Sequence, residues 1–138
     1  MNKTTESDIF KLIKKAVINL KLNCFLTRIE SGLTLNGIPD LYLVYHSKLI
    51  NKSISFWLEL KANNSKNCNV SKYQFNWILK HNKAGGVAYI LNKPLEERGL
   101  KLYRVDPCSV LTEQLSVDYS VTGVANVLEH VAKKHCSC

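Results

Sequence analysis

The sequence lacks several features that would place it in common protein classes. None of its apolar runs approaches the roughly 18 residues of a membrane span, and no signal peptide precedes the polar N-terminus. It has no glycine-rich phosphate loop, so nothing suggests an ATP-driven enzyme, and no Ser/His/Asp or Cys/His set suggests covalent catalysis. We therefore expect a cytoplasmic protein with no membrane partner.

The cysteines do not form the pattern of a disulfide framework. They are five, an odd number without framework spacing, which indicates a reducing compartment. His130, His135, Cys136 and Cys138 suggest a zinc site near the C-terminus, but the Cys-x-Cys pair has no second cysteine pair at ordinary spacing. At 138 residues and 46% hydrophobic composition, residues 1–138 are expected to form one domain with a substantial core.

Acidic residues are the most informative shortage. The chain has 19 basic and 11 acidic residues, a formal charge of +8, which favours a polyanionic partner. Between Ile9 and Leu95 there are thirteen Lys or Arg but only three acids, namely Glu30, Asp40 and Glu59. Two of these three fall in one short stretch, so their placement is not surface scatter. The low acid content and the many Asn and Lys residues would suit a phage or mobile-element gene.

That stretch, residues 37–62, organises the chain. Two apolar runs, 41–45 and 55–60, flank a polar segment and predict two adjacent strands, most simply a hairpin. Side chains alternate along a strand, so Glu59 and Lys61 share one face, and Asp40 at the start of the neighbouring strand can reach the same space. Two carboxylates beside a lysine are what a divalent-metal hydrolytic site needs. The alternative is a buried acid–lysine ion pair that only closes the hairpin.

The segments on either side of the hairpin predict an α/β fold. Residues 5–21 predict an amphipathic helix, 24–29 a strand, 71–82 a helix capped by Ser71, and 87–91 a buried strand joined by a crossover. Residues 100–105 predict an edge strand, and 107–115 and 121–134 predict helices, so that 107–138 would be a C-terminal helical extension. On the helix 71–82, Trp77 is expected to pack in the core and His81 to lie on the surface.

Ordered motifs along this framework resemble the PD-(D/E)XK nucleases. The resemblance is carried by Gly37-Ile38-Pro39-Asp40 and Glu59-Leu60-Lys61, with Arg28-Ile29-Glu30-Ser31-Gly32 before them and Gln74-Phe75-Asn76-Trp77 after them. Within that superfamily the set is similar to the small stand-alone VRR-NUC branch and related phage endonucleases. It covers residues 4–91, about two-thirds of the chain. The resemblance implies a restriction-endonuclease-like core with a central mixed sheet of four or five strands flanked by helices.

The resemblance also implies roles for individual residues. Asp40 and Glu59 would bind Mg²⁺ or Mn²⁺ with the Leu60 carbonyl, and Lys61 would position or activate the attacking water. The family often brings an acid from the first helix to the metal, and Glu6 fits that position, although Glu6 could instead only complement the helix dipole. Whether Glu6 or Glu30 completes the site stays open. Gln74 would bind a metal-bound water or a phosphate. The DNA-backbone contacts would be Arg28, Ser31, Lys66 and Lys72, with a local pair to Glu30 as the alternative for Arg28.

The predicted function is therefore metal-dependent endonucleolytic cleavage of DNA. The resemblance points to branched, flap or junction DNA rather than to a fixed palindrome, and to a homodimer whose interface could be the apolar side of the helix 121–134. Two other classes stay open: a non-catalytic nucleic-acid-binding module on the same fold, and an assembly protein whose basic face binds a partner.

Overall fold

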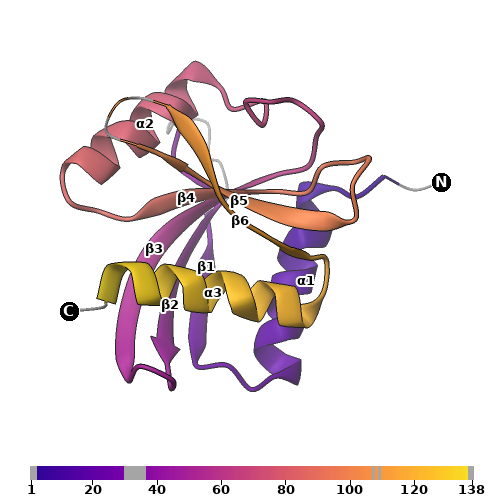
Figure 1. Cartoon of the computed structure of the whole chain (residues 1–138), viewed down its shortest axis with the longest axis vertical. Helices are drawn as coiled ribbons and strands as arrows, with labels where there is room; N and C mark the ends of the chain where they lie inside the picture. Colours follow the sequence, from indigo (N-terminus) through magenta and orange to yellow (C-terminus); the bar gives the residue numbers. More distant parts are fainter. Residues whose placement is uncertain (1–2, 30–36, 107, 109, 137–138) are drawn as a thin grey trace.

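The computed structural model describes residues 3–29, 37–106, 108 and 110–136. Nine helices and strands follow one another along this part of the chain (Figure 1). They are α1 (Glu6–Asn19), β1 (Cys24–Arg28), β2 (Leu41–Ser47), β3 (Lys52–Lys61), α2 (Lys72–Lys83), β4 (Ala88–Asn92), β5 (Gly99–Val105), β6 (Leu111–Asp118) and α3 (Val121–Cys136). None of the described helices is long and apolar enough to cross a membrane.

The six strands form one mixed sheet in the order in which they occur in the chain. All neighbours are antiparallel except β3 and β4, which are parallel and joined by α2. The predicted hairpin is confirmed as β2 and β3, in which Leu41 lies opposite Leu58 and Tyr45 opposite Ile54. The α/β class and the mixed sheet flanked by helices are thus as predicted, with six strands instead of four or five.

The two faces of the sheet carry different cores. On one face, α1 and α3 cover alternate residues of the central strands, including Phe56, Leu58 and Tyr89. On the other face, α2 covers a smaller cluster around Ile78 and Ile90. Figure 1 shows α2 above the sheet and α1 and α3 below it. Because α2 lies over β4 and β5, no described helix covers the outer face of β1 and β2.

The helix predicted for residues 107–115 is wrong, because residues 111–118 form strand β6. Leu111 and Leu115 are four residues apart, a spacing typical of one helix face. In the structure, Leu102 lies opposite Leu115 while Tyr103 lies opposite Glu113, so one residue of β6 bulges out between them. The bulge turns Leu115 toward α3 and Leu111 toward α2, and the strand alternation is lost from the sequence.

Two further expectations about the C-terminal half need correction. Strand β5 is not at the edge, because it pairs with β4 on one side and β6 on the other. The apolar side of α3 is not free for a partner, because it is buried against α1 and the sheet. Its buried residues are Val124, Val127, Leu128, Val131 and Ala132. The predicted dimer interface on this helix is therefore wrong.

Candidate metal centre

Three carboxylates from three separate elements meet at one end of the β2–β3 hairpin. Glu6 comes from the first turn of α1, Asp40 immediately precedes β2, and Glu59 lies near the end of β3. One carboxylate oxygen of each lies within 4.8 Å of those of the other two. Among the described residues this is the one group of three or more acidic, His or Cys side chains so close together.

The carboxylates of Asp40 and Glu59 are each held by a backbone amide of the facing strand end. The Asp40 amide donates to Glu59 Oε1 at 3.1 Å, and the Leu60 amide donates to Asp40 Oδ2 at 3.1 Å. Within a strand the N–H and C=O of one residue point to the same side. The Leu60 carbonyl therefore points toward the side of β3 on which Asp40 lies, as the predicted ligand role requires.

Glycine at position 37 lets the chain approach α2 closely before it reaches Asp40. Its φ of +93° lies in the left-handed region, which other residues rarely adopt. A Cβ atom there would lie 2.5 Å from the Tyr73 carbonyl oxygen in the first turns of α2. The segment that carries Asp40 is thus packed against the same helix that carries Gln74.

Glu6 does not serve as the cap of α1. The N-cap is Thr5, whose side chain accepts from the Asp8 amide at 3.2 Å, while Asp8 Oδ2 accepts from the Thr5 amide at 2.8 Å. This reciprocal capping box satisfies the first turn without Glu6. The Glu6 carboxylate instead lies against Asp40 and Glu59.

Lys61 and Gln74 both contact Glu59. Lys61 Nζ lies 3.6 Å from Glu59 Oε2, and Gln74 Nε2 donates to the same oxygen at 2.7 Å. Gln74 Oε1 accepts from the Ser71 amide at 3.0 Å, which completes the N-terminal capping box of α2. Gln74 therefore fixes the carboxylate of Glu59, a contact that the sequence did not indicate.

The cluster is electrostatically strained without a cation. Glu59 is 1% exposed, and burial together with the neighbouring Asp40 charge raises its pKa to about 8. Burial also raises the pKa of Glu6, and Asp40 adds to that rise while Lys61 and Arg28 oppose it. A simple ion pair would match one carboxylate with one lysine, whereas here three carboxylates meet and only Glu59 has an ion pair, with Lys61.

This arrangement fits a small divalent cation. Carboxylate and carbonyl oxygens are the ligands that Mg²⁺ and Mn²⁺ prefer. A divalent ion among the three carboxylates would offset both the cost of burying Glu59 and Glu6 as charged groups and the repulsion from Asp40 that further raises their pKa values. The donor set is all oxygen. The C-terminal histidines and cysteines are weak evidence for zinc in the sequence, and the His135 Nε2 atom lies 2.6 Å from the Tyr89 hydroxyl; Cys138 lies outside the described residues.

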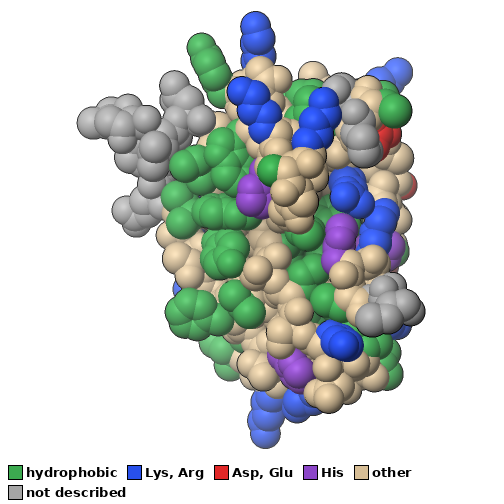
Figure 2. Space-filling view, turned by 90° about the vertical axis from the view of Figure 1, so that its left-hand side faces the viewer, with side chains coloured by type: hydrophobic (Ala, Val, Ile, Leu, Met, Phe, Trp, Pro, Cys, Tyr) green, Lys and Arg blue, Asp and Glu red, His purple; other side chains and the backbone are tan. Residues whose placement is uncertain are grey.

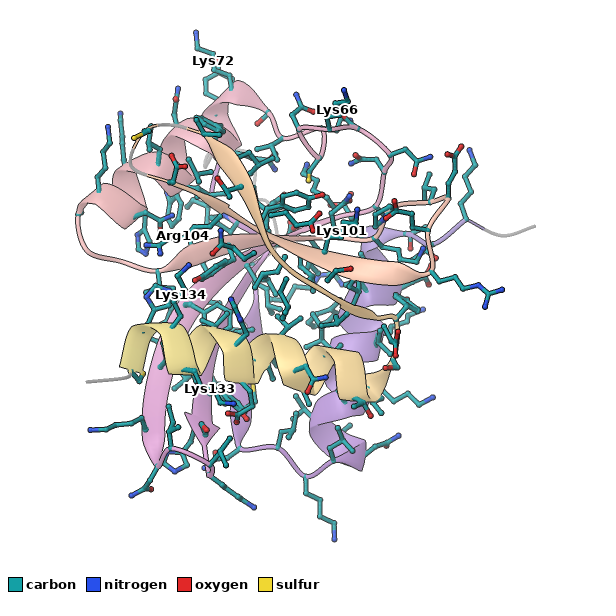
Figure 3. The ribbon with its side chains drawn as sticks, in the orientation of Figure 1. Lys66, Lys72, Lys101, Arg104, Lys133 and Lys134 are labelled. Atoms are coloured by element: carbon teal, nitrogen blue, oxygen red, sulfur yellow. The ribbon has the colours of Figure 1, made fainter. Side chains whose placement is uncertain are left out.

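The predicted DNA contacts are spread around this end of the molecule. Arg28 is exposed at the end of β1, where its guanidinium stacks 4.7 Å from the centre of the Phe10 ring. Lys66 is exposed on the loop after β3, and Lys72 is exposed at the start of α2 (Figure 3). Ser31 and Glu30 lie outside the described residues, and with them the predicted Arg28–Glu30 pair.

An aromatic row lies beside the cluster on the same face of the sheet. Tyr42 packs on Trp57 with ring centres 4.9 Å apart, and Trp57 meets the edge of Trp77 at 5.4 Å. His81 stacks on Trp77 at 4.8 Å, and burial lowers its pKa. Trp77 packs against the sheet as predicted but stays half-buried, and His81 is a packing residue as much as a surface one.

The row continues into exposed apolar side chains on the outer face of β1 and β2. Phe25 is 71% exposed and lies opposite Val44, which is 37% exposed. Figure 2 shows hydrophobic side chains gathered on the left of that view. This surface could not be predicted from the sequence, because alternation predicts that one strand face is covered but not which helix covers it.

Comparison with solved structures identifies relatives of the fold. The chain is similar to Hjc, a Holliday junction resolvase from the hyperthermophilic archaeon Archaeoglobus fulgidus, with a TM-score of 0.51 and 16% sequence identity. The match covers 86% of this chain and 98% of that one. The chain shares the fold of that resolvase. No family model and no curated protein sequence matches it.

At 16% identity the likeness extends to the fold alone, so the metal, substrate and subfamily rest on the chain's own residues. Those residues are Glu6, Asp40, Glu59, Lys61 and Gln74, which the structure brings together at the hairpin end.

Proposed function

We propose that this protein is a metal-dependent endonuclease that hydrolyses phosphodiester bonds in DNA. The observation that carries the proposal is the meeting of Glu6, Asp40 and Glu59, each within 4.8 Å of the others, beside Lys61 in a chain of charge +8. Carboxylates without a cation would repel phosphate. A bound cation turns the same cluster into a phosphate site.

Separate residues would bind the metal ion and position the attacking water. Asp40, Glu59 and Glu6, with the Leu60 carbonyl, would hold Mg²⁺ or Mn²⁺, which when bound supplies Lewis-acid stabilisation of the charge developing on the phosphate. Lys61 would orient the attacking water and offset that charge. Water adds to phosphorus and releases a proton to solvent, the bond to the leaving sugar oxygen breaks, and that oxygen takes a proton from solvent.

Gln74 has a positioning role in this scheme. Its amide holds Glu59 Oε2 while its own oxygen is fixed by the first turn of α2. Because the Gln74 side chain is held at both ends, it keeps the Glu59 carboxylate in one rotamer. Catalytic groups must be positioned to within about half an ångström, so this restraint matters for activity. Gln74 thus acts through Glu59 rather than on the water directly.

Branched DNA is the substrate class that we favour. The chain is similar in fold to a protein whose substrate is a branched DNA, a Holliday junction resolvase. Exposed cations on separate elements, including Arg28, Lys66 and Lys72, would contact the backbone of more than one arm. Affinity should fall steeply as salt rises.

Cleavage of a labelled panel tests the function. Single-stranded, duplex, flap and four-way-junction DNA would each be incubated with Mg²⁺, Mn²⁺ or EDTA, beside Asp40→Asn as the control. We expect metal-dependent cutting that is greatest on the branched substrates and absent from the variant. Tight binding without cutting on every substrate would instead support a non-catalytic nucleic-acid-binding module.

Thermal unfolding tests the metal centre separately. A ligand at about 100 times its Kd stabilises the native state by about 2.7 kcal/mol, so Mn²⁺ should raise the Tm of the wild-type protein. The rise should be lost in Asp40→Asn. An assembly protein that only uses its basic face predicts no response to the ion in either protein.

A homodimer would suit the cutting of two strands, and the uncovered outer face of β1 and β2 is its best surface. Phe25 and Val44 are exposed there, and the face is continuous with the aromatic row beside the metal centre. Two copies joined through it would place both centres near one interface. Sedimentation of Phe25→Ser beside the wild type tests this, since the variant should be monomeric.

A further inference from the structure

A second group of basic side chains lies away from the metal centre, on the face of the sheet that α1 and α3 cover. It consists of Arg104 on β5 with His130, Lys134 and His135 on α3, and we call it the Arg104 cluster (Figure 3). The Arg104 guanidinium lies 6.0 Å from the centre of the Tyr89 ring, and the Tyr89 hydroxyl lies 2.6 Å from His135 Nε2. An aromatic ring thus holds both the arginine and the histidine.

Carboxylates do not neutralise this cluster. In the described part of the chain, the ion pairs within 4.0 Å join only Lys61 with Glu59, and Lys101 with Glu97 and Glu113. Lys134 is bonded to the neutral amide of Gln114. The charges repel one another: burial, then Arg104 and Lys134, lower the pKa of His135 to about 4, and burial followed by Arg104 lowers that of Lys134.

The Arg104 cluster also contains a buried side-chain nitrogen without a hydrogen-bond partner. His130 Nε2 is the one buried side-chain nitrogen or oxygen without a partner among the described residues that are not exposed. Lys134 lies one helical turn after His130 and lowers its pKa, after burial. Uncompensated charge and an unpartnered polar atom together are typical of a surface completed by a bound anion or water.

The Arg104 cluster lies on the opposite face of the sheet from the metal centre. Glu59 lies beside Ile90 and Ile90 beside Tyr103, so Tyr103 is two strand spacings, about 10 Å, from Glu59. Arg104 follows Tyr103 in the strand, so its side chain leaves the other face and meets Tyr89 in the core beneath α3. The cluster cannot contact the phosphate that occupies the metal centre.

We propose that Arg104 and Lys134 form a second phosphate-binding site, which holds the backbone of a DNA arm that leads away from the cutting site. The inference rests on the proposed nuclease function for its ligand, and deepens it: a substrate with arms in two directions engages both faces of the sheet. A guanidinium presents a fixed fork to phosphate oxygens, and an ammonium one turn from the end of α3 adds a point charge.

Binding of a four-way junction across a salt series tests this site. The charge-removing pair Arg104→Gln with Lys134→Gln would be compared with the parent protein, both carrying Asp40→Asn so that no DNA is cut. Loss of two phosphate contacts should weaken junction binding by roughly tenfold or more and reduce the slope of log affinity against log salt by about 1.8. A short duplex that covers only the metal centre should be affected much less.

Two matched variants separate charge from packing. Lys133→Gln removes one charge from the adjacent position, which projects from the other side of α3 in Figure 3, and should leave the slope unchanged. Arg104→Lys with Lys134→Arg keeps both charges and should retain most of the affinity. If this pair loses as much as the Gln pair, or if Lys133→Gln has an equal effect, the proposal is overturned.

The outcomes also separate this site from the nuclease proposal. Metal-dependent cutting by the wild-type protein, with an unchanged salt slope in the Gln pair, would overturn the Arg104 cluster alone. A reduced slope without any cutting by the wild type would leave the cluster as a nucleic-acid site and reject the nuclease. If the Gln pair lost equal affinity for the junction and for the short duplex, the claim that the Arg104 cluster binds a second DNA arm would be rejected.

Discussion

Near the end of β3, side chains on both faces of the strand are buried, but one face carries leucines and the other a glutamate. Leu58 and Leu60 are 1% and 2% exposed beneath α1 and α3, and Glu59 between them is 1% exposed on the other face. Burial therefore does not distinguish core from site in this strand. The difference is that the apolar face needs no ligand, whereas we expect the charged face to be stabilised by a bound cation.

The same contrast explains how the two faces tolerate change. A buried hydrocarbon face is stabilised by area and packing, so its substitutions act on the free energy of unfolding. A buried carboxylate is costly unless it is paired, so substitutions on its face act on ion binding and on catalysis. The predictions below test whether the two faces can be altered independently.

The largest expected effect is on cleavage, in Lys61→Ala. Loss of a group that orients the water should lower the cleavage rate by about 10²- to 10⁴-fold, because positioned acid–base groups contribute that much. DNA binding should be retained, since Lys61 is one of many cations. Single-turnover cleavage and a binding titration measure the two quantities, and intact cleavage with lost binding would contradict the role given to Lys61.

Leu58→Ala should act on the other face and on stability. Truncating a leucine that is 1% exposed costs about 2 to 5 kcal/mol of unfolding free energy. Denaturant unfolding measures this cost. The response to Mn²⁺ should remain, because Leu58 points away from the carboxylates. Ser55→Ala, at an exposed position of the same strand, is the matched control and should change stability by less than about 0.5 kcal/mol.

Gly37→Ala should lower both the stability of the protein and its rate of cleavage. It introduces a side chain at φ +93° and within 2.5 Å of the Tyr73 carbonyl oxygen, at a cost of about 1 to 3 kcal/mol for the backbone strain alone. It should also displace Asp40 and slow cleavage. Gly85→Ala is the control, because its φ is +97° but nothing lies within 4 Å of the added Cβ. If both variants cleave equally slowly, the contact with α2 does not position Asp40.

The smallest effect, per unit of pH, concerns Glu59. Its pKa of about 8 in the folded protein lies above the ordinary 4.5, so the unfolded chain ionises first as pH rises. The metal-free protein should therefore lose stability between about pH 5 and pH 8, by up to about 1 kcal/mol per pH unit from this group. The stability is fully present below pH 4.5, where both states are protonated.

Glu59→Gln should flatten this dependence, and Mg²⁺ should do so in the wild type. Thermal unfolding in EDTA across the pH range measures it. Glu96→Gln, at an exposed carboxylate, is the control and should keep the slope of the wild type. A wild-type slope that survives in Glu59→Gln would mean that another group is responsible.

Local signals in the sequence predicted the β2–β3 hairpin, the positions of Glu59 and Lys61 on it, and the start of α2. Alternation in residues 55–61 placed Glu59 and Lys61 together, and the capping pattern placed the start of α2 within one residue. Glu6 came only from the resemblance, because nothing in its spacing relates it to Asp40, 34 positions later. Its meeting with the other two carboxylates depends on how α1 packs on the sheet.

The sequence was least informative where contacts join distant residues or where a bulge breaks the period. Leu111 and Leu115 carry a helical spacing in a strand because the bulge in β6 restarts the alternation. Gln74 could not be assigned to Glu59 without the crossover that sets α2 over the strand end. The Arg104 cluster draws on positions about 30 residues apart, and no periodicity links them.

The reciprocal hydrogen bonds between the strand ends have a consequence for ion size. Glu59 Oε1 and Asp40 Oδ2 are each fixed by a backbone amide, so neither carboxylate can rotate freely to offer both oxygens to one ion. Ca²⁺ takes six to eight oxygens in flexible, often bidentate arrangements, whereas Mg²⁺ accepts a few single oxygens and keeps its waters. We therefore expect the hairpin end to discriminate by radius, admitting the smaller ion and leaving the larger one under-coordinated.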